Sequence, residues 1–237
     1  MNESQKNYGW ARAFPLIALL FASGIGVLLS IARIVSTHNA HYAMLPGNLF
    51  LAWLPLVFAM GVYHLHRNGE RRSLRLGVLA GLWLLFFPNA PYIFTDLVHM
   101  WTYFRFAFWL DLSLVLLVAL TGFLVGFVSL YLMQSVVVER FGRLMGWLFI
   151  LVVAWLTGFG VYMGRFLRLN SWDALVHPLS VTHSIGHLAT HPLDHPDTVT
   201  FPLLFATFLF LGYLMLYALT HLQSATQGRV QSLKFEG

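Results

Sequence analysis

The stretch LGVLAGLWLLFFPNAPYIFTDLVHM, residues 76–100, joins a long apolar run to a group of polar residues. The run from Leu76 to Phe87 has 12 residues. As an α-helix it would extend about 18 Å, whereas the hydrocarbon core of a bilayer is about 30 Å thick. Pro88 would therefore lie below the membrane surface. The stretch predicts a membrane helix that breaks at Pro88, with its irregular backbone shielded by protein or facing a wet cavity.

The composition of the whole chain supports this membrane assignment. Hydrophobic residues make up 58% of the 237 residues and charged residues 10%, against about 25% charged residues in soluble domains. Mean hydropathy is +0.71. The chain has no cysteine, which excludes disulfides, thiolate metal ligands and a cysteine nucleophile. We therefore expect an all-α, polytopic membrane helix bundle that forms a single integral membrane domain over residues 1–237.

The apolar runs predict about six transmembrane helices. They cover residues 14–32 and 48–64, the run from 76 to the break at Pro88, and segments within 106–133, 144–163 and 201–219. The first run follows Lys6 and Arg12 but is longer than a signal-peptide core, so we interpret it as a retained anchor. An amphipathic interfacial helix is expected after the fifth span, within an outer loop at 164–200, and residues 222–237 form a tail.

Loop charges predict the orientation. If the N-terminus is cytoplasmic, ten basic residues fall on the inner side and four on the outer side. This positive-inside bias predicts that both termini are cytoplasmic and that the tail is a cytoplasmic tail. The net charge of +5 then reflects membrane orientation, and no basic run is dense enough to predict nucleic-acid binding.

The residues after the break have the spacing of one helix face. Asn89 is a favourable N-cap and Pro91 suits the first turn of a restarted helix. Such a helix would place four side chains on one face, namely Tyr92, Asp96, His99 and Tyr103. The alternative is a packing kink whose polar groups bond internally.

A second polar stretch, GFGVYMGRFLRLNSWD at residues 158–173, ends the fifth span on the same side. Gly160 and Gly164 form a GxxxG pattern, as do Gly122 and Gly126 in the fourth span, and this pattern permits close helix packing. Asn170 can cap a following helix, with Asp173 completing a capping box.

Asp111 is the charged residue placed deepest in an apolar span. An intramembrane carboxylate costs about 2.5–3.5 kcal/mol on insertion scales, so it should face a cavity or a partner. The candidate partners end on the same side of the membrane: Arg105, Arg165 and Arg168. A structural ion pair between helices is the alternative interpretation.

The segments PNAPYIFTDLVH and GRFLRLNSWD resemble the two signature segments of a bacterial integral-membrane family known as domain-of-unknown-function family 1361. The resemblance covers roughly residues 48–173. It implies a multi-pass protein of the bacterial cell (inner) membrane whose two outer motifs matter, and it implies no particular chemistry.

The loop after the fifth span is rich in histidine. His183, His187 and His191 recur every four residues, a spacing that can hold zinc on a helix. Pro192 interrupts the run, so we favour a solvated loop without metal and keep these three residues as weak candidates. No P-loop, GxSxG or dinucleotide fingerprint is present, and we expect no cofactor.

Three classes of function are compatible with these patterns. The first is a binding or accessory subunit whose outer-leaflet polar cavity recognises a lipid headgroup or another membrane protein. The second is an outer-face enzyme acting on a lipid-linked substrate, with Asp96 or His99 as general base. The third is a small transporter with the broken helix at its site. The candidate site residues, expected to converge with Asn48, are Asn89, Tyr92, Asp96, His99, Tyr103, Arg105, Asp111, Arg165, Arg168, Asn170 and Asp173.

Overall fold

The computed structural model describes residues 3–70, 73–99, 108–168, 176 and 197–235. Every regular element in these ranges is helical, which confirms the all-α prediction. In chain order the elements are α1 (Glu3–Thr37), η1 (Ala40–Ala43), α2 (Met44–Arg67), α3 (Leu74–Phe86), α4 (Asn89–Tyr92), η2 (Ile93–His99), α6 (Phe108–Phe141), α7 (Arg143–Phe166) and α10 (Asp197–Phe235).

Six spans are long and apolar enough to cross a membrane, as predicted. They cover Phe14–Thr37, Ala40–Arg67, Leu74–Leu97, Phe108–Phe141, Arg143–Phe166 and Thr198–His221. Large apolar side chains remain exposed along them, among them Phe14, Phe21 and Leu204. Such a surface suits lipid rather than water, so the chain is a multi-pass membrane protein.

Helix α6 forms the centre of the bundle. It contacts α1, α2, α4, η2 and α7, while α10 packs mainly on α7. In the most apolar window of α6, 61% of the residues are buried, against 22% in α1 and in α10. The main core joins aromatic side chains from several helices, including Trp83, Phe123, Phe127 and Tyr213.

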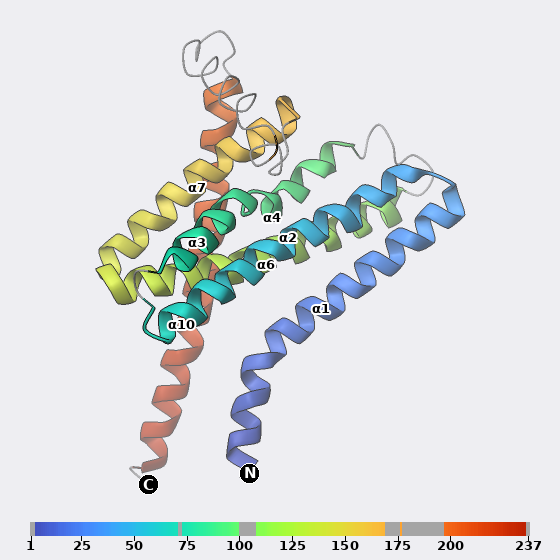
Figure 1. Cartoon of the computed structure of the whole chain (residues 1–237). Coiled ribbons are helices and arrows are strands. Elements are labelled where there is room, and N and C mark those ends of the chain that lie inside the picture. The colour runs from blue at the N-terminus through green and yellow to red at the C-terminus, as the bar shows by residue number, and fades with distance from the viewer. Residues whose placement is uncertain (1–2, 71–72, 100–107, 169–175, 177–196, 236–237) are drawn as a thin grey trace.

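The N- and C-terminal ends of the chain lie at the same end of the bundle, as Figure 1 shows. We call this the terminal end and the opposite one the distal end. At the terminal end, Gly69 and Gly142 have positive φ angles of 86° and 90°, which side chains rarely tolerate, and they lie in the turns after α2 and α6. The break after α3 and the first turn of α6 belong to the distal end, where the predicted polar residues gather.

The expected interfacial helix and histidine loop cannot be compared with this fold. Both belong to residues 169–196, and of these the structure describes Val176 alone.

Candidate functional site

The predicted break at Pro88 is present. Helix α3 has 13 residues, about 20 Å of helix, and it ends at Phe86. Proline carries no N–H, so Pro88 and Pro91 cannot donate to the carbonyls four residues before them. The Phe87 oxygen, which would accept the N–H of residue 91 in a continuous helix, accepts the Ala90 N–H at 3.1 Å. The chain turns between α3 and α4 for this reason.

Asn89 has a different role from the one predicted. Its side-chain Nδ2 donates to the Phe86 carbonyl oxygen at 2.9 Å, and the residue flanking α4 on the N-terminal side is Pro88, which makes no side-chain cap. In a continuous helix the Phe86 carbonyl would accept the Ala90 N–H, which here bonds to Phe87. Asn89 therefore closes the end of α3 rather than capping the start of α4, so the N-cap prediction is wrong.

The restarted helix also differs from the prediction. Pro91 does lie in the first turn of α4, but from Ile93 the backbone is a 3₁₀-helix. With three residues per turn, the four-residue spacing from Tyr92 to Asp96 no longer places these two residues on one face. The expected α-helical face is therefore wrong over the described residues, and Tyr103 lies outside them.

Glycines of α6 and α7 leave the space that the broken segment occupies. A Cβ at Gly122 would meet the Ile93 side chain at 2.6 Å, and one at Gly126 would meet the Ala90 Cβ at 2.7 Å. On the other side, a Cβ at Gly160 of α7 would meet the Pro88 ring at 2.8 Å. The predicted GxxxG patterns of α6 and α7 thus include glycines that let the break enter between these two helices.

Asp96 belongs to η2, which packs on α2 and α6. Its side chain is 3% exposed, and its Oδ2 accepts a hydrogen bond from Asn48 Nδ2 of α2 at 2.8 Å. The positive charge of Arg165, in the last turn of α7, also acts on the Asp96 carboxylate. A carboxylate in such a place needs donors or a cation, and this site offers both. The structure therefore pairs Asp96 directly with Asn48, while Arg165 contributes a positive charge through space; we call these three residues the Asp96 site.

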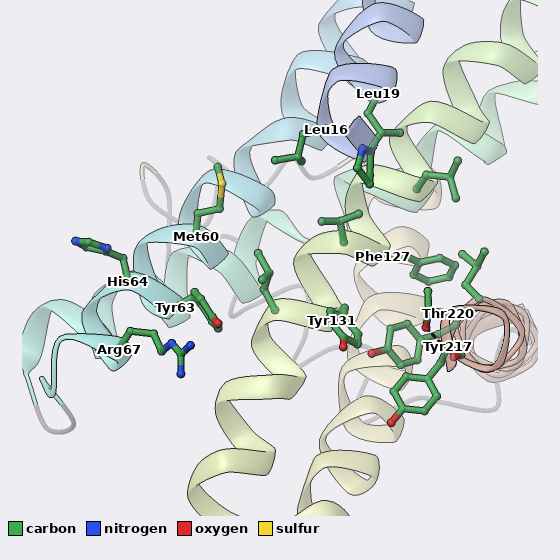
Figure 2. A pocket seen from close by; sticks show the side chains of 16 residues that line it. Leu16, Leu19, Met60, Tyr63, His64, Arg67, Phe127, Tyr131, Tyr217 and Thr220 are labelled. Atoms are coloured by element: carbon green, nitrogen blue, oxygen red, sulfur yellow. Dashed lines mark hydrogen bonds between the residues drawn. The ribbon is translucent and has the colours of Figure 1, made fainter. Parts of the chain in front are cut away.

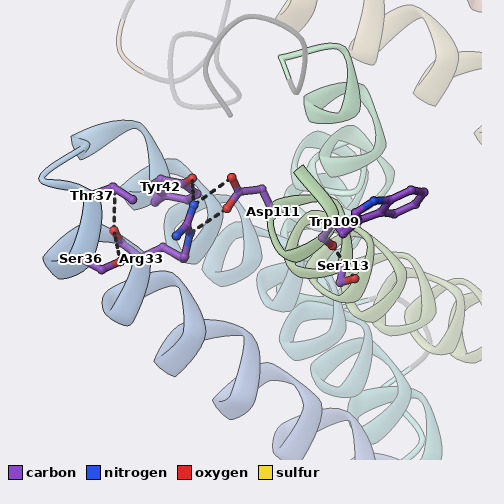
Figure 3. A network of polar contacts seen from close by, with 7 residues as sticks. All are labelled: Arg33, Ser36, Thr37, Tyr42, Trp109, Asp111 and Ser113. Atoms are coloured by element: carbon purple, nitrogen blue, oxygen red, sulfur yellow. Dashed lines mark hydrogen bonds and ion pairs between the residues drawn. The ribbon is translucent and has the colours of Figure 1, made fainter. Parts of the chain in front are cut away.

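Asp111 has a partner that the sequence analysis missed. Arg33 Nε donates to Asp111 Oδ1 at 2.7 Å and Arg33 Nη2 to Oδ2 at 3.0 Å, so the pair is bidentate. The same Nη2 donates to the Tyr42 hydroxyl at 3.0 Å (Figure 3). Asp111 is fully buried and Arg33 is 14% exposed.

The prediction that Asp111 pairs with Arg165 or Arg168 is therefore corrected, and Arg105 lies outside the described residues. Asp111 opens α6 and faces the last turns of α1, where Arg33 reaches it. The signal was available, since Arg33 is one of the four basic residues assigned to the outer side. This ion pair joins α1 to the central helix α6. It shares no residue with the Asp96 site.

The remaining candidates divide into two groups. Arg168 follows α7, is exposed and has a positive φ of 55°, a conformation common just after a helix end. Outside the described side chains lie Tyr103, Arg105, Asn170, Asp173, His183, His187 and His191, together with the side chain of His99. Among the side chains that the structure describes, no group of three could hold a metal ion.

Comparison with known families identifies the chain. The family described as "Protein of unknown function (DUF1361)" matches residues 48–226, about three quarters of the sequence, and the chain belongs to this family. The match includes α2 from Asn48 onward, the break at Pro88 and the polar end of α7, and it extends beyond the predicted residue 173 into α10. Comparisons with curated proteins and with solved structures gave no match.

Proposed function

We propose that this family member is a binding or accessory protein without a catalytic step, and that the Asp96 site recognises the headgroup of a phospholipid. One observation supports this most directly: beside a broken membrane helix, a buried carboxylate accepts a hydrogen bond from an amide of another helix, and the charge of a guanidinium at the end of a third helix acts on it through space. Irregular backbone at membrane depth occurs only where it is buried in protein or lines a water-filled cavity, so the polar groups of this segment must find partners there. The inner-membrane location and the cytoplasmic termini belong to the same proposal.

The two charges favour a zwitterionic headgroup. Asp96 can accept an ammonium group, and the half-buried Arg165 can hold a phosphate through a bidentate contact. A phosphoethanolamine headgroup carries both groups on one short chain. Asn48 would keep the Asp96 carboxylate oriented, because it donates to one oxygen and leaves lone pairs on both.

The test compares lipids that remain attached to the protein after gentle extraction. The parent chain and two variants, Asp96→Asn and Arg165→Gln, would be purified in native lipid discs and analysed by mass spectrometry for lipids and proteins. Ser113→Ala is the matched control, because that exposed hydroxyl bonds only to Trp109 of its own helix. We expect phosphatidylethanolamine to be enriched with the parent and the control and depleted with both variants.

Other results would lead to a different function. If both variants fold normally and retain the same lipids as the parent, the Asp96 site is a purely structural contact. Loss of one co-purifying protein would support the accessory role through a membrane-protein partner. Lipid fragments that form with the parent and not with Asp96→Asn would instead indicate an enzyme.

A further inference from the structure

We propose a second lipid site at the terminal end of the bundle, independent of the Asp96 site. A groove there binds one acyl chain of an anionic phospholipid, and Arg67 holds the phosphate at its mouth. Figure 2 shows the groove and the side chains that line it.

The groove is large and its walls are mostly apolar. It has a volume of about 880 Å³, near the upper end of the roughly 300–1,000 Å³ typical of small-molecule sites. Its walls come from α1, α2, α6 and α10. The apolar lining includes Leu16 and Leu19 of α1, Leu124 and Phe127 of α6, and Leu216 of α10.

The depth of the groove matches one leaflet. On α6 its lining runs from Leu124 to Leu132, about 12 Å of helix, and on α10 from Tyr213 to Thr220, about 10 Å. Half of the hydrocarbon core is about 15 Å thick. A transmembrane helix from a partner would need a surface that continues across both leaflets, so a lipid tail suits this groove better.

The mouth of the groove carries a cation and several donors. Arg67 ends α2, is exposed, and lies over the Tyr63 ring with 5.6 Å between its Cζ and the ring centroid. In the described part of the chain, the Arg67 guanidinium has no hydrogen-bond partner, and the hydroxyls of Tyr63, Tyr131 and Tyr217 have none either. These groups can therefore donate to the oxygens of a phosphate.

A smaller cavity extends the same polar region. It has a volume of about 130 Å³, shares Tyr131 and Tyr217 with the groove, and is lined further by Gln134, Ser135 and Arg143 among others. Arg143 adds a second positive charge beyond the two tyrosines. The charge at this end of the groove is thus complementary to an anionic headgroup.

The headgroup should decide which lipid binds. A lipid tail gains little when it leaves the bilayer for an apolar groove, because both surroundings are equally apolar. A basic residue near an anionic lipid surface contributes about fivefold in affinity, equivalent to ~1 kcal/mol. Selectivity for phosphatidylglycerol over phosphatidylcholine should therefore depend on Arg67.

The experiment measures lipid binding to the purified full chain by native mass spectrometry. Dioleoylphosphatidylglycerol and dioleoylphosphatidylcholine are titrated separately. We expect the parent to bind phosphatidylglycerol about fivefold more tightly or better, Arg67→Gln to remove this preference, and Arg67→Lys to keep most of it. Arg75→Gln is the matched control: Arg75 is an exposed basic residue in the first turn of α3 that does not line the groove, and its replacement should change nothing.

Two further arms locate the lipid. Val128→Trp fills the groove from α6 and should weaken both lipids, whereas Asp96→Asn should leave phosphatidylglycerol binding unchanged. Free glycerol 3-phosphate should not compete. Each of four results would overturn the proposal. The parent could bind the two lipids equally, or Arg67→Gln and Arg75→Gln could lose binding equally. Glycerol 3-phosphate could compete, or a polypeptide could occupy the groove in the purified protein.

Discussion

Replacing one partner of the Arg33–Asp111 pair should destabilise the bundle more than replacing both. Asp111 is fully buried, and both of its oxygens accept hydrogen bonds from Arg33 at 2.7 and 3.0 Å. In Asp111→Ala the 14% exposed Arg33 keeps its charge but loses its counterion. Loss of one partner of a buried pair typically costs about 3–5 kcal/mol, and replacing both partners with apolar residues costs much less.

The assay is thermal unfolding in mild detergent, followed by tryptophan fluorescence and by the amount of monodisperse protein. For a chain of this size ~1 kcal/mol corresponds to about 2–4 °C in Tm, so Asp111→Ala should lower Tm by about 10 °C. The double variant Arg33→Met, Asp111→Leu should recover more than half of that loss. Ser113→Ala, two residues from Asp111 and on the exposed side of α6, should stay within about 2 °C of the parent. If the double variant loses as much as the summed losses of Arg33→Met and Asp111→Leu measured singly, the two residues do not interact, and our assignment of the ion pair as the contact that joins α1 to α6 fails.

Three more predictions follow from the break and from the loops. Gly126→Ala should lower the free energy of unfolding by about 1–3 kcal/mol, because the new Cβ would meet the Ala90 Cβ. Gly24→Ala is the control: it has open space at its Cβ and should be neutral or slightly stabilising. Equal melting temperatures of the two variants would contradict the packing of α4 on α6. Reporter fusions after residues 70 and 140 should read cytoplasmic and fusions near residues 40, 97 and 190 external; a cytoplasmic signal near residue 97 would reverse the orientation of the Asp96 site. Protein purified without a histidine tag should contain no zinc, and about one equivalent that disappears when His183, His187 and His191 are replaced by alanine would show that the loop is a metal site.

The spans, the break and the need for a partner at Asp111 are local features of the chain, and the sequence alone determined them. Hydropathy placed all six spans, because the length of an apolar run and its cost in water are properties of consecutive residues. The break at Pro88 was predictable for the same reason, since a missing N–H acts on the carbonyl four residues earlier. The presence of a paired carboxylate at Asp111 also followed from the cost of burying a charge.

The identity of each partner depended on tertiary packing. Arg33 and Asp111 are 78 residues apart, and Asn48 and Asp96 are 48 apart, so their contacts exist only because α1 and α2 pack beside α6 and the broken segment. Asn89 bonds backwards to Phe86 because the segment after it turns into the space left by Gly122 and Gly126. Spacing along a chain can place a residue at one end of a membrane bundle, but the side chain that it meets is set by which helices pack together and by their rotation about their axes.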